Sequence, residues 1–214
     1  MNYRRPKGTF DILPEDAPRW RAVEDAFRDT CARYGYGEIR TPIFEDTDLF
    51  TRSVGEETDI VSKEMYTFED KGGRSQTLRA EGTAPTVRAF IEENMQGQDQ
   101  EKLVRLFYLA PIFRYDRPQA GRYRQHHQAG IEALGSMDPA VDAEIIDLAL
   151  SFYRDLGIEG TRLLVNSVGC PNCAPAYVDK LKAAIADRVE DLCGDCQRRF
   201  DTNPLRVLAC KKES

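Results

Sequence analysis

The sequence predicts an α+β fold, in which an antiparallel sheet packs against helices. Residues 65–79 and 107–132 each contain two apolar runs separated by a turn or loop, which indicates two pairs of antiparallel strands. Other segments carry apolar residues at helical spacing. Strands joined by hairpins and mixed with amphipathic helices are typical of this class.

The first expected helix covers residues 14–34, where apolar residues from Trp20 to Cys31 recur at helical spacing and Gly35 provides the stop signal. Cys31 belongs to this stripe and is expected in the core. The hairpin over residues 65–79 follows, with Lys71-Gly72-Gly73 as its turn.

Three further helices are expected. One begins at Thr83 and places that residue near a helix N-terminus. Another covers residues 141–156 and ends before Gly157. The last covers residues 175–191 as one continuous helix with Pro175 in its first turn. The regular apolar positions of these helices predict core packing and no binding site.

Composition excludes several classes of protein. The chain has 214 residues, 41% of them hydrophobic, so it can bury a core. It contains no apolar run of transmembrane length, and its N-terminus MNYRRPKGTF lacks the apolar core of a signal peptide. We therefore expect a cytoplasmic protein with no membrane partner. The net charge of −6 opposes general binding of polyanions, so any nucleic acid must be held by local basic patches.

The second strand of the 107–132 pair has an unusual polar face. Period-two alternation puts His126, Gln128, Gly130 and Glu132 on the same side. Each buried polar group without a partner costs about 1–3 kcal/mol. We therefore expect a polar ligand against this face, whereas His127 lies on the opposite face and is interpreted as structural.

The loop before that strand is locally basic in an acidic chain. Four arginines, Arg114, Arg117, Arg122 and Arg124, accompany a single acidic residue, Asp116. The planar guanidinium group fits phosphate oxygens in pairs, which favours a polyphosphate or nucleic-acid site. A solvated hairpin whose charges only confer solubility is the alternative.

Four segments together resemble one family. Residues 113–132 contain FRYDRP and GRYRQHHQAGIE, and residues 35–42 are GYGEIRTP. Residues 78–83 are LRAEGT, and residues 5–14 are RPKGTFDILP. These segments are similar to the second motif, the first motif, the amino-acid-binding loop and the N-terminus of histidyl-tRNA synthetases, which are class II aminoacyl-tRNA synthetases. The family usually has proline at the position of Ala80.

The resemblance implies ATP-dependent activation of histidine to histidyl-adenylate, followed by transfer to tRNA(His). It implies that the Glu81-Gly82-Thr83 segment binds histidine, with Glu81 and Thr83 holding its α-amino group. Gln128 would contact the backbone end of the amino acid. Glu132 would accept a hydrogen bond from the substrate imidazole.

The resemblance also implies an ATP site, with Mg²⁺ as part of the substrate complex. Arg114 would be the catalytic residue that clamps the α-phosphate, where charge develops, and Arg122 would reach the outer phosphates. Asp116 and His126 occupy positions where the family usually has glutamate and an adenine-stacking phenylalanine. Aspartate is one methylene shorter than glutamate, and imidazole offers less apolar surface than phenyl, so both differences bear on the affinity for ATP.

Two macromolecular partners are implied in the same way. The acceptor stem of tRNA(His) would face the loop residues Arg117, Gln119, Arg122 and Arg124. A second copy of the chain would form a homodimer through the first-motif region, residues 35–42.

The cysteines form a separate pattern. Cys170 and Cys173, then Cys193 and Cys196, are two CxxC pairs at a spacing compatible with a four-cysteine zinc site. A continuous 17-residue helix between the pairs would separate them by about 25 Å, so thiol pairs are favoured over zinc and no metal ligand is assigned. Cys210 has no expected role.

The family's later segments, an Arg-Gly-Leu-Asp-Tyr-Tyr motif, the third class II motif and an anticodon-binding domain, are not found in these 214 residues. We therefore expect a catalytic core over residues 1–168 that is incomplete. Residues 169–214, with a helix flanked by the CxxC pairs, would lead toward an inserted domain. The alternative function is a non-catalytic regulatory subunit of ATP phosphoribosyltransferase, whose members resemble the same portion.

Overall fold

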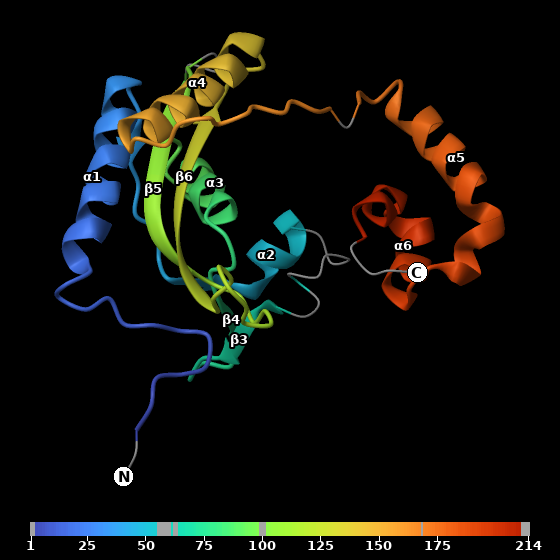
Figure 1. The fold of residues 1–214 in the computed structure, drawn as a ribbon, viewed down its shortest axis with the longest axis horizontal. Helices are drawn as coiled ribbons and strands as arrows, with labels where there is room; N and C mark the ends of the chain where they lie inside the picture. The colour runs from blue at the N-terminus through green and yellow to red at the C-terminus, as the bar shows by residue number, and fades with distance from the viewer. Residues whose placement is uncertain (1–2, 55–60, 62–63, 99–101, 168, 211–214) are drawn as a thin grey trace. The chain divides into compact units, whose positions relative to one another are not determined.

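The computed structural model of the chain forms two compact units, residues 1–161 and 162–214 (Figure 1). The structure describes residues 3–54, 61, 64–98, 102–167 and 169–210. Each unit is described by itself below. The functional boundary predicted after residue 168 stays a prediction.

The larger unit contains two three-stranded sheets. The first has the order β1-β5-β6 and consists of β1 (Gly37–Glu38), β5 (Val104–Phe113) and β6 (Gln125–Leu134). The second has the order β2-β4-β3 and consists of β2 (Phe44–Asp46), β4 (Ser75–Leu78) and β3 (Tyr66–Glu69). All neighbouring strands are antiparallel except β1 and β5, which are parallel. The hairpin predicted over residues 65–79 is therefore confirmed.

The β5–β6 pair is the longest ladder in the described part of the chain. Its register runs from Val104 opposite Leu134 to Phe113 opposite Gln125. The predicted arrangement of strand, basic loop and strand is confirmed. Because side chains alternate along a strand, this register decides which residues of the two strands share a face.

Helices cover both faces of this sheet (Figure 1). The first face packs against α1 (Ala17–Arg33) and α4 (Pro139–Asp155). The opposite face meets α3 (Thr83–Glu92), which contacts α2 (Thr47–Val54). The buried core of the first face consists of Phe27, Cys31, Tyr36, Phe107 and Leu148. The core position predicted for Cys31 is confirmed.

Local signals explain where the helices begin and end. At the start of α4, the Asp138 side chain accepts a hydrogen bond from the Ala140 N–H at 2.9 Å, and Pro139 occupies the first helical position. After the helix, Gly157 adopts a φ of +72°, which a residue with a side chain rarely adopts. The helices expected over residues 14–34 and 141–156 are confirmed within two or three residues.

Partly buried polar contacts hold the strands against their neighbours. Arg105 on β5 donates two hydrogen bonds of 2.9 Å to Glu144 on α4, and Tyr36 donates a third to the same carboxylate. Arg79 is only 5% exposed, and its guanidinium donates to the carbonyl oxygens of Pro111 and Thr41 at 2.8 and 2.9 Å. Arg79 therefore ties the first-motif segment to the end of β5.

The smaller unit consists of short helices, and one prediction about it is wrong. Its elements are α5 (Ala174–Ile185), the 3₁₀ segment η2 (Ala186–Asp191), α6 (Gly194–Thr202) and the 3₁₀ segment η3 (Pro204–Ala209). Residues 175–191 are not one continuous α-helix. The backbone leaves the α-helical region at Ile185, where φ is −116°, and continues as a 3₁₀ segment that ends in extended Leu192.

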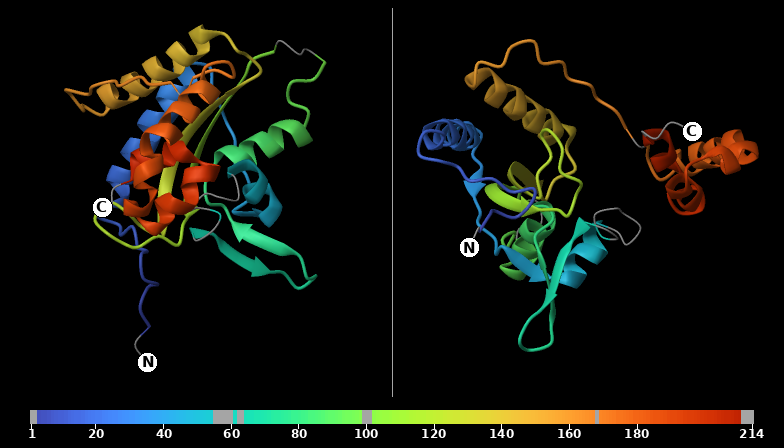
Figure 2. Two further views of the ribbon diagram at one scale, coloured as in Figure 1. Left: turned by 90° about the vertical axis from the view of Figure 1, so that its right-hand side faces the viewer. Right: turned by 60° about the horizontal axis from the view of Figure 1, so that its bottom comes forward.

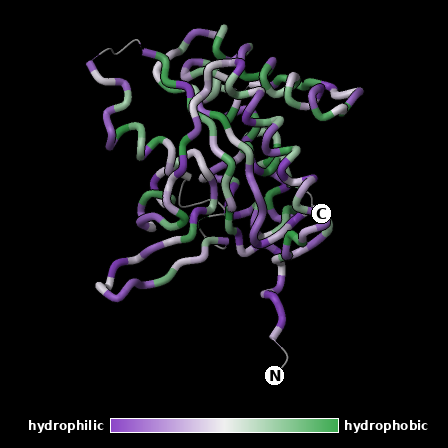
Figure 3. The backbone as a smooth tube through the Cα atoms, turned by 90° about the vertical axis from the view of Figure 1, so that its left-hand side faces the viewer, coloured by the Kyte–Doolittle hydropathy of each residue, from purple (hydrophilic) through white to green (hydrophobic). Residues whose placement is uncertain are grey.

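The α+β class is confirmed by these two sheets with their flanking helices. The β3–β4 hairpin projects from the larger unit (Figure 2), and hydrophilic residues predominate toward its tip (Figure 3). In the ranges that the structure describes, no helix combines the length and apolarity that a bilayer crossing requires.

We expect Leu148→Ala to destabilise the larger unit by about 2–5 kcal/mol, because truncation leaves a cavity in a closely packed core. Leu148 is 1% exposed. Urea unfolding followed by the fluorescence of Trp20, the single tryptophan of the sequence, measures the change. Leu13→Ala is the matched control, since Leu13 is 48% exposed. Equal effects of the two substitutions would contradict the placement of Leu148 in the core.

Candidate functional site

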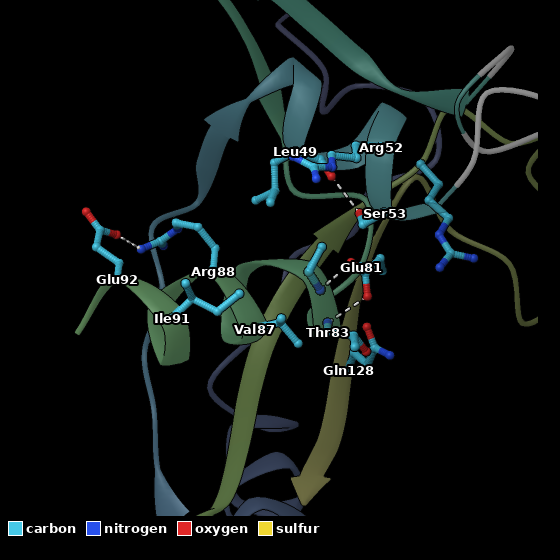
Figure 4. Close-up of a pocket in the computed structure, with 12 residues that line it drawn as sticks. Leu49, Arg52, Ser53, Glu81, Thr83, Val87, Arg88, Ile91, Glu92 and Gln128 are labelled. Carbon is cyan, nitrogen blue, oxygen red and sulfur yellow. Dashed lines mark hydrogen bonds and ion pairs between the residues drawn. The ribbon is translucent and has the colours of Figure 1, made fainter. Parts of the chain in front are cut away.

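A cavity of about 1010 Å³ opens between α2, α3 and the polar face of β6 (Figure 4). Four of the predicted site residues contribute to its wall, namely Glu81, Thr83, Arg114 and Gln128. The remaining described lining residues are Leu49, Arg52, Ser53, Ala84, Val87, Arg88, Ile91 and Glu92. Apolar side chains of α2 and α3, namely Leu49, Ala84, Val87 and Ile91, thus share the cavity wall with carboxylate, hydroxyl, amide and guanidinium groups.

The start of α3 connects two of the predicted carboxylates. Glu81 accepts hydrogen bonds from the backbone N–H groups of Thr83 and Ala84 at 2.6 and 2.7 Å, so its charge lies at the positive end of the helix. The Thr83 hydroxyl donates to Glu132 Oε1 at 2.7 Å. Glu81, Thr83 and Glu132 therefore form one network that joins α3 to β6.

Gln128 carries the most informative polar atom of the site. Its side-chain oxygen, Oε1, is buried and accepts no hydrogen bond from the described residues. Buried polar atoms are nearly always paired, and leaving one unpaired costs about 1–3 kcal/mol. A ligand with an N–H or O–H donor would satisfy this atom.

Tyr108 lies beneath the network and was not anticipated from the sequence. It is 5% exposed, and the β5–β6 register places it opposite Gly130. A Cβ atom on Gly82 or Gly130 would come within 2.2 Å of the Tyr108 ring. Both glycines are therefore required for the ring to fit between the start of α3 and β6. The contribution of Gly82 to the site is that its missing side chain lets the Tyr108 ring lie against its backbone.

Burial changes the pKa of two ionisable groups here, Glu132 and Tyr108. It raises the pKa of Glu132, and the nearby Glu81 charge raises it further, while the hydrogen bond from Thr83 opposes both. Burial likewise raises the pKa of Tyr108 to about 12, so its hydroxyl stays protonated at neutral pH. Burial therefore disfavours the charged form of Glu132, and a cationic or hydrogen-bonding ligand would stabilise that form.

The basic loop begins at Arg114, whose Nε donates to the Ala80 carbonyl oxygen at 2.7 Å. This bond anchors the guanidinium at the cavity wall. Farther along, Arg122 pairs with Asp116 at 2.9 Å, and Arg124 stacks over the Tyr115 ring, 3.7 Å from its centroid. Two loop arginines are thus held by neighbours, and neither lines the cavity in the described part of the chain.

The remaining loop residues lie at or near the loop tip. Gln119 and Arg122 form an isolated antiparallel bridge, so the loop folds back on itself. Arg117 is exposed, and its backbone N–H donates to the Asp116 carboxylate at 2.7 Å. Asp116 therefore organises the loop through its side chain.

The two histidines separate as the alternation predicts. His126 is half-buried beside Arg114, and burial followed by that positive charge lowers its pKa, which favours the neutral imidazole. His127 instead packs against Trp20 of α1, with 4.7 Å between the ring centroids and 57° between the ring planes. The predicted placement of His127 on the face opposite His126 is confirmed, and its structural role stays a prediction.

Sequence reasoning missed Tyr108 and Arg79, as well as the α2 residues of the cavity wall. Strand alternation offered a signal for Tyr108, because a glycine between Gln128 and Glu132 leaves room for a large cross-strand side chain. No comparable signal existed for α2, since its position depends on the packing of α2 against α3.

Comparison with known proteins identifies the family that shares this arrangement. The family described as histidyl-tRNA synthetase matches residues 8–195, which is most of the chain. The chain belongs to the histidyl-tRNA synthetase family. The resemblance of the four sequence segments to this family is thereby confirmed.

Curated relatives agree over almost the whole chain. The histidine–tRNA ligase of Moorella thermoacetica is 58% identical over 97% of this chain, and that of Geobacillus thermodenitrificans is 54% identical over 100%. These matches cover 48% and 50% of the relatives. The chain therefore spans about half the length of the curated histidine–tRNA ligases it matches.

Solved structures share the fold. The chain matches apo histidyl-tRNA synthetase from S. aureus with a TM-score of 0.77 at 42% identity, over 98% of this chain and 49% of that one. It also matches a Bacillus halodurans protein described as an ATP phosphoribosyltransferase regulatory subunit/histidyl-tRNA synthetase, over 93% of this chain and 55% of that one. The second match has a TM-score of 0.65 at 22% identity, which shows the fold alone.

We expect Gly130→Ala to destabilise the larger unit by about 1–3 kcal/mol, because the new methyl group would overlap the Tyr108 ring. Thermal unfolding measures the loss. Gly37→Ala is the matched control, since Gly37 is also a strand glycine and its added Cβ would meet nothing closer than the Arg105 carbonyl oxygen at 3.9 Å. If both variants melted together, the close approach of Tyr108 would be refuted.

The raised pKa of Glu132 leads to a prediction about how the stability of the chain depends on pH. Between the ordinary carboxyl pKa and this raised value, the folded chain binds more protons than the unfolded chain, so stability falls as the pH rises. Glu132→Gln removes this titration. We therefore expect the melting temperature of Glu132→Gln to gain on that of the wild type between pH 4.5 and pH 8.

Glu144→Gln provides the control with the opposite sign. The hydrogen bonds from Arg105 lower the pKa of Glu144, so its contribution is present at neutral pH and is lost as the pH falls through the lowered value. Glu144→Gln should therefore fall further below the wild type only as the pH rises toward 4.5, and its deficit should stay constant between pH 4.5 and pH 8. Parallel melting curves for the wild type and Glu132→Gln across this pH range would contradict the assignment.

Proposed function

We propose that this chain supplies the part of a histidine–tRNA ligase that binds histidine and the α-phosphate of ATP, and that it serves ATP-dependent activation of histidine. The observation that carries the proposal is Gln128 Oε1, a buried acceptor that the described residues leave unpaired, beside the Thr83–Glu132 hydrogen bond. This acceptor, close to the carboxylates of Glu81 and Glu132, suits a small ligand rich in N–H donors.

Histidine provides donors that match these acceptors. Its α-ammonium group carries three N–H donors, which would bind Glu81, Thr83 and Gln128. The imidazole N–H would donate to Glu132, whose raised pKa means that such a donor stabilises the charged form. Tyr108 would hold the Glu132 side chain in place, and Gly82 would keep Tyr108 in its position.

The second substrate would be ATP with Mg²⁺. In the reaction, a carboxylate oxygen of histidine attacks the α-phosphorus, the bond to the pyrophosphate oxygen breaks, and pyrophosphate leaves. Two anions must approach, so catalysis depends on positioning and charge neutralisation. Arg114 at the cavity wall would bind the α-phosphate, and Mg²⁺ would neutralise the outer phosphates.

The loop would complete the nucleotide and tRNA contacts. Arg122 would reach the outer phosphates after exchanging its Asp116 partner for a phosphate, and the half-buried His126 would stack on adenine. Arg117, Gln119, Arg122 and Arg124 would face the acceptor stem of tRNA(His). Their charge is local, as a chain of net charge −6 requires for binding a polyanion.

A homodimer through residues 35–42 is also proposed. These residues run through β1, and Arg79 binds the Thr41 carbonyl oxygen, so the first-motif segment is attached to the β5 end that leads to Arg114. A partner at this segment could therefore support the site. We further propose that residues 1–168 form the catalytic part and that residues 169–214 lead into a separate domain.

The regulatory function has less support than the ligase. Curated relatives at 51–58% identity carry the name histidine–tRNA ligase, whereas the regulatory description belongs to a structure at 22% identity. The set of acceptors and Arg114 also matches the needs of amino-acid activation.

A chimeric enzyme tests the proposal. The chain replaces the matching half of the Moorella histidine–tRNA ligase, and ATP–pyrophosphate exchange is measured with and without histidine. We expect histidine-dependent exchange, and a loss of about 100-fold or more for Arg114→Ala in the chimera, because one donor to the developing charge is removed. Arg74→Ala is the matched control, since Arg74 lies beyond the hairpin turn and pairs only with Asp70 among the described residues.

The outcome is clear in either direction. A chimera that melts like the parent enzyme yet shows no histidine-dependent exchange would refute the ligase proposal. Exchange that Arg114→Ala leaves intact would refute the role of Arg114 alone.

A further inference from the structure

Three cysteines of the smaller unit meet in space although they are separated in sequence. The sulfur atoms of Cys193, Cys196 and Cys210 all lie within 4.8 Å of one another. Cys193 and Cys196 bracket the start of α6, and Cys210 directly follows η3. Contact between α6 and η3 brings the three thiols together.

The spacing of the sulfur atoms fits a shared metal ion better than a disulfide. Two thiolates at tetrahedral positions with bonds of about 2.3 Å lie about 3.8 Å apart. The Cys193 and Cys210 sulfur atoms are 3.8 Å apart. A disulfide would require about 2.05 Å. A contraction of less than about 1 Å would bring all three to the spacing that a tetrahedral ion requires.

The backbone around the cluster is held in place. The Cys193 carbonyl oxygen accepts hydrogen bonds from the N–H groups of Cys196 and Gln197 at 2.8 and 3.0 Å. The Gln197 side chain donates to the carbonyl oxygens of Glu190 and Leu192 at 3.1 and 2.8 Å. These bonds fix the backbone of the turn that carries Cys193 and Cys196, two of the three cysteines.

The smaller unit buries few side chains apart from this cysteine cluster. Cys196 and Pro204 are its only buried residues in the part that the structure describes, and Cys196 is 1% exposed. Small units that cannot bury enough apolar surface commonly gain stability from a metal ion. An ion bound by Cys196 would therefore sit where this unit has its best-buried side chain.

We propose that Cys193, Cys196 and Cys210 bind one Zn²⁺ ion as three thiolates, which leaves a fourth tetrahedral position for a further ligand. Thiolate ligands and tetrahedral geometry favour zinc among the common divalent ions. Binding releases the thiol protons that remain at the working pH, and no electron is transferred. The ion joins α6 to the end of η3 and stabilises the smaller unit.

This cluster differs from the four-cysteine arrangement that the CxxC spacing suggests. Cys170 and Cys173 lie beside each other, with their sulfur atoms 3.5 Å apart, and do not belong to the cluster. Cys210, for which the sequence predicted no role, takes part instead. The long continuous helix that argued against zinc is absent, because α5 ends at Ile185.

The test is the metal content of the purified 214-residue chain, prepared with a phosphine reductant, loaded with Zn²⁺ and desalted. Inductively coupled plasma mass spectrometry should find about one zinc per chain. Cys193→Ser, Cys196→Ser and Cys210→Ser should each lower this content by about tenfold or more after a competing chelator. Cys170→Ser and Cys173→Ser are the matched controls and should keep their zinc.

A second set of measurements separates ligand loss from unfolding. Cobalt(II) in place of zinc should give the visible absorption bands of a tetrahedral thiolate site. Cys210→His should retain zinc where Cys210→Ser does not, because imidazole is also a zinc ligand. A Cys210→His chain as empty as Cys210→Ser would overturn Cys210 as a ligand.

Other outcomes would also overturn the proposal. These are a chain without zinc after loading, a bound iron–sulfur cluster, and a Cys193–Cys210 disulfide that forms in place of metal binding. Loss of zinc from Cys170→Ser or Cys173→Ser would replace the three-cysteine site with the four-cysteine one. None of these results depends on ligase activity, so the zinc site and the proposed function fail independently.

Discussion

The register between β5 and β6 is the constraint on which the larger unit depends. It places Tyr108 opposite Gly130 and Gln128 opposite Ala110, and so puts the polar residues toward α3 while Phe107 and Ile131 face α1 and α4. A shift by one residue would exchange these faces, because side chains alternate along a strand. The hydrophobic core and the ligand-facing residues are therefore specified by the same ladder.

The candidate site combines residues that are held firmly in place with polar groups that lack favourable interactions. Glu81 is held by the backbone amides of α3, and Tyr108 is enclosed by two glycines. Within this rigid frame, burial disfavours the charged form of Glu132, and Gln128 Oε1 has no hydrogen-bond partner among the described residues. Free energy lost at such groups is recovered when a ligand binds, which is how a preformed polar site obtains affinity and specificity.

The basic loop and the three-cysteine cluster share one feature: protein contacts position their ligand-binding groups. In the basic loop, Asp116 holds Arg122, so the loop has a defined shape before any phosphate arrives. In the smaller unit, the thiols of Cys193, Cys196 and Cys210 lie within 4.8 Å of one another, and Cys196 is the most deeply buried of the three. A phosphate at the basic loop and a Zn²⁺ ion at the cysteine cluster would each bind to groups that protein contacts already hold near one another. The larger unit can rely on its apolar core, whereas the smaller unit has few buried residues among those described.

The sequence by itself determined the α+β class, the main helices and hairpins, and the polar face with Gln128 and Glu132, because these follow from local periodicity and turn signals. The family followed from motif residues in their order. Only the tertiary structure decided that Tyr108 lies between Gly82 and Gly130, that α2 lines the cavity, and that Cys210 joins Cys193 and Cys196. These contacts join residues far apart in the chain, and their formation depends on packing between elements, which local periodicity does not encode. Local periodicity also led to the wrong prediction for residues 175–191. The apolar positions continue at helical spacing past Ile185, whereas α5 ends there.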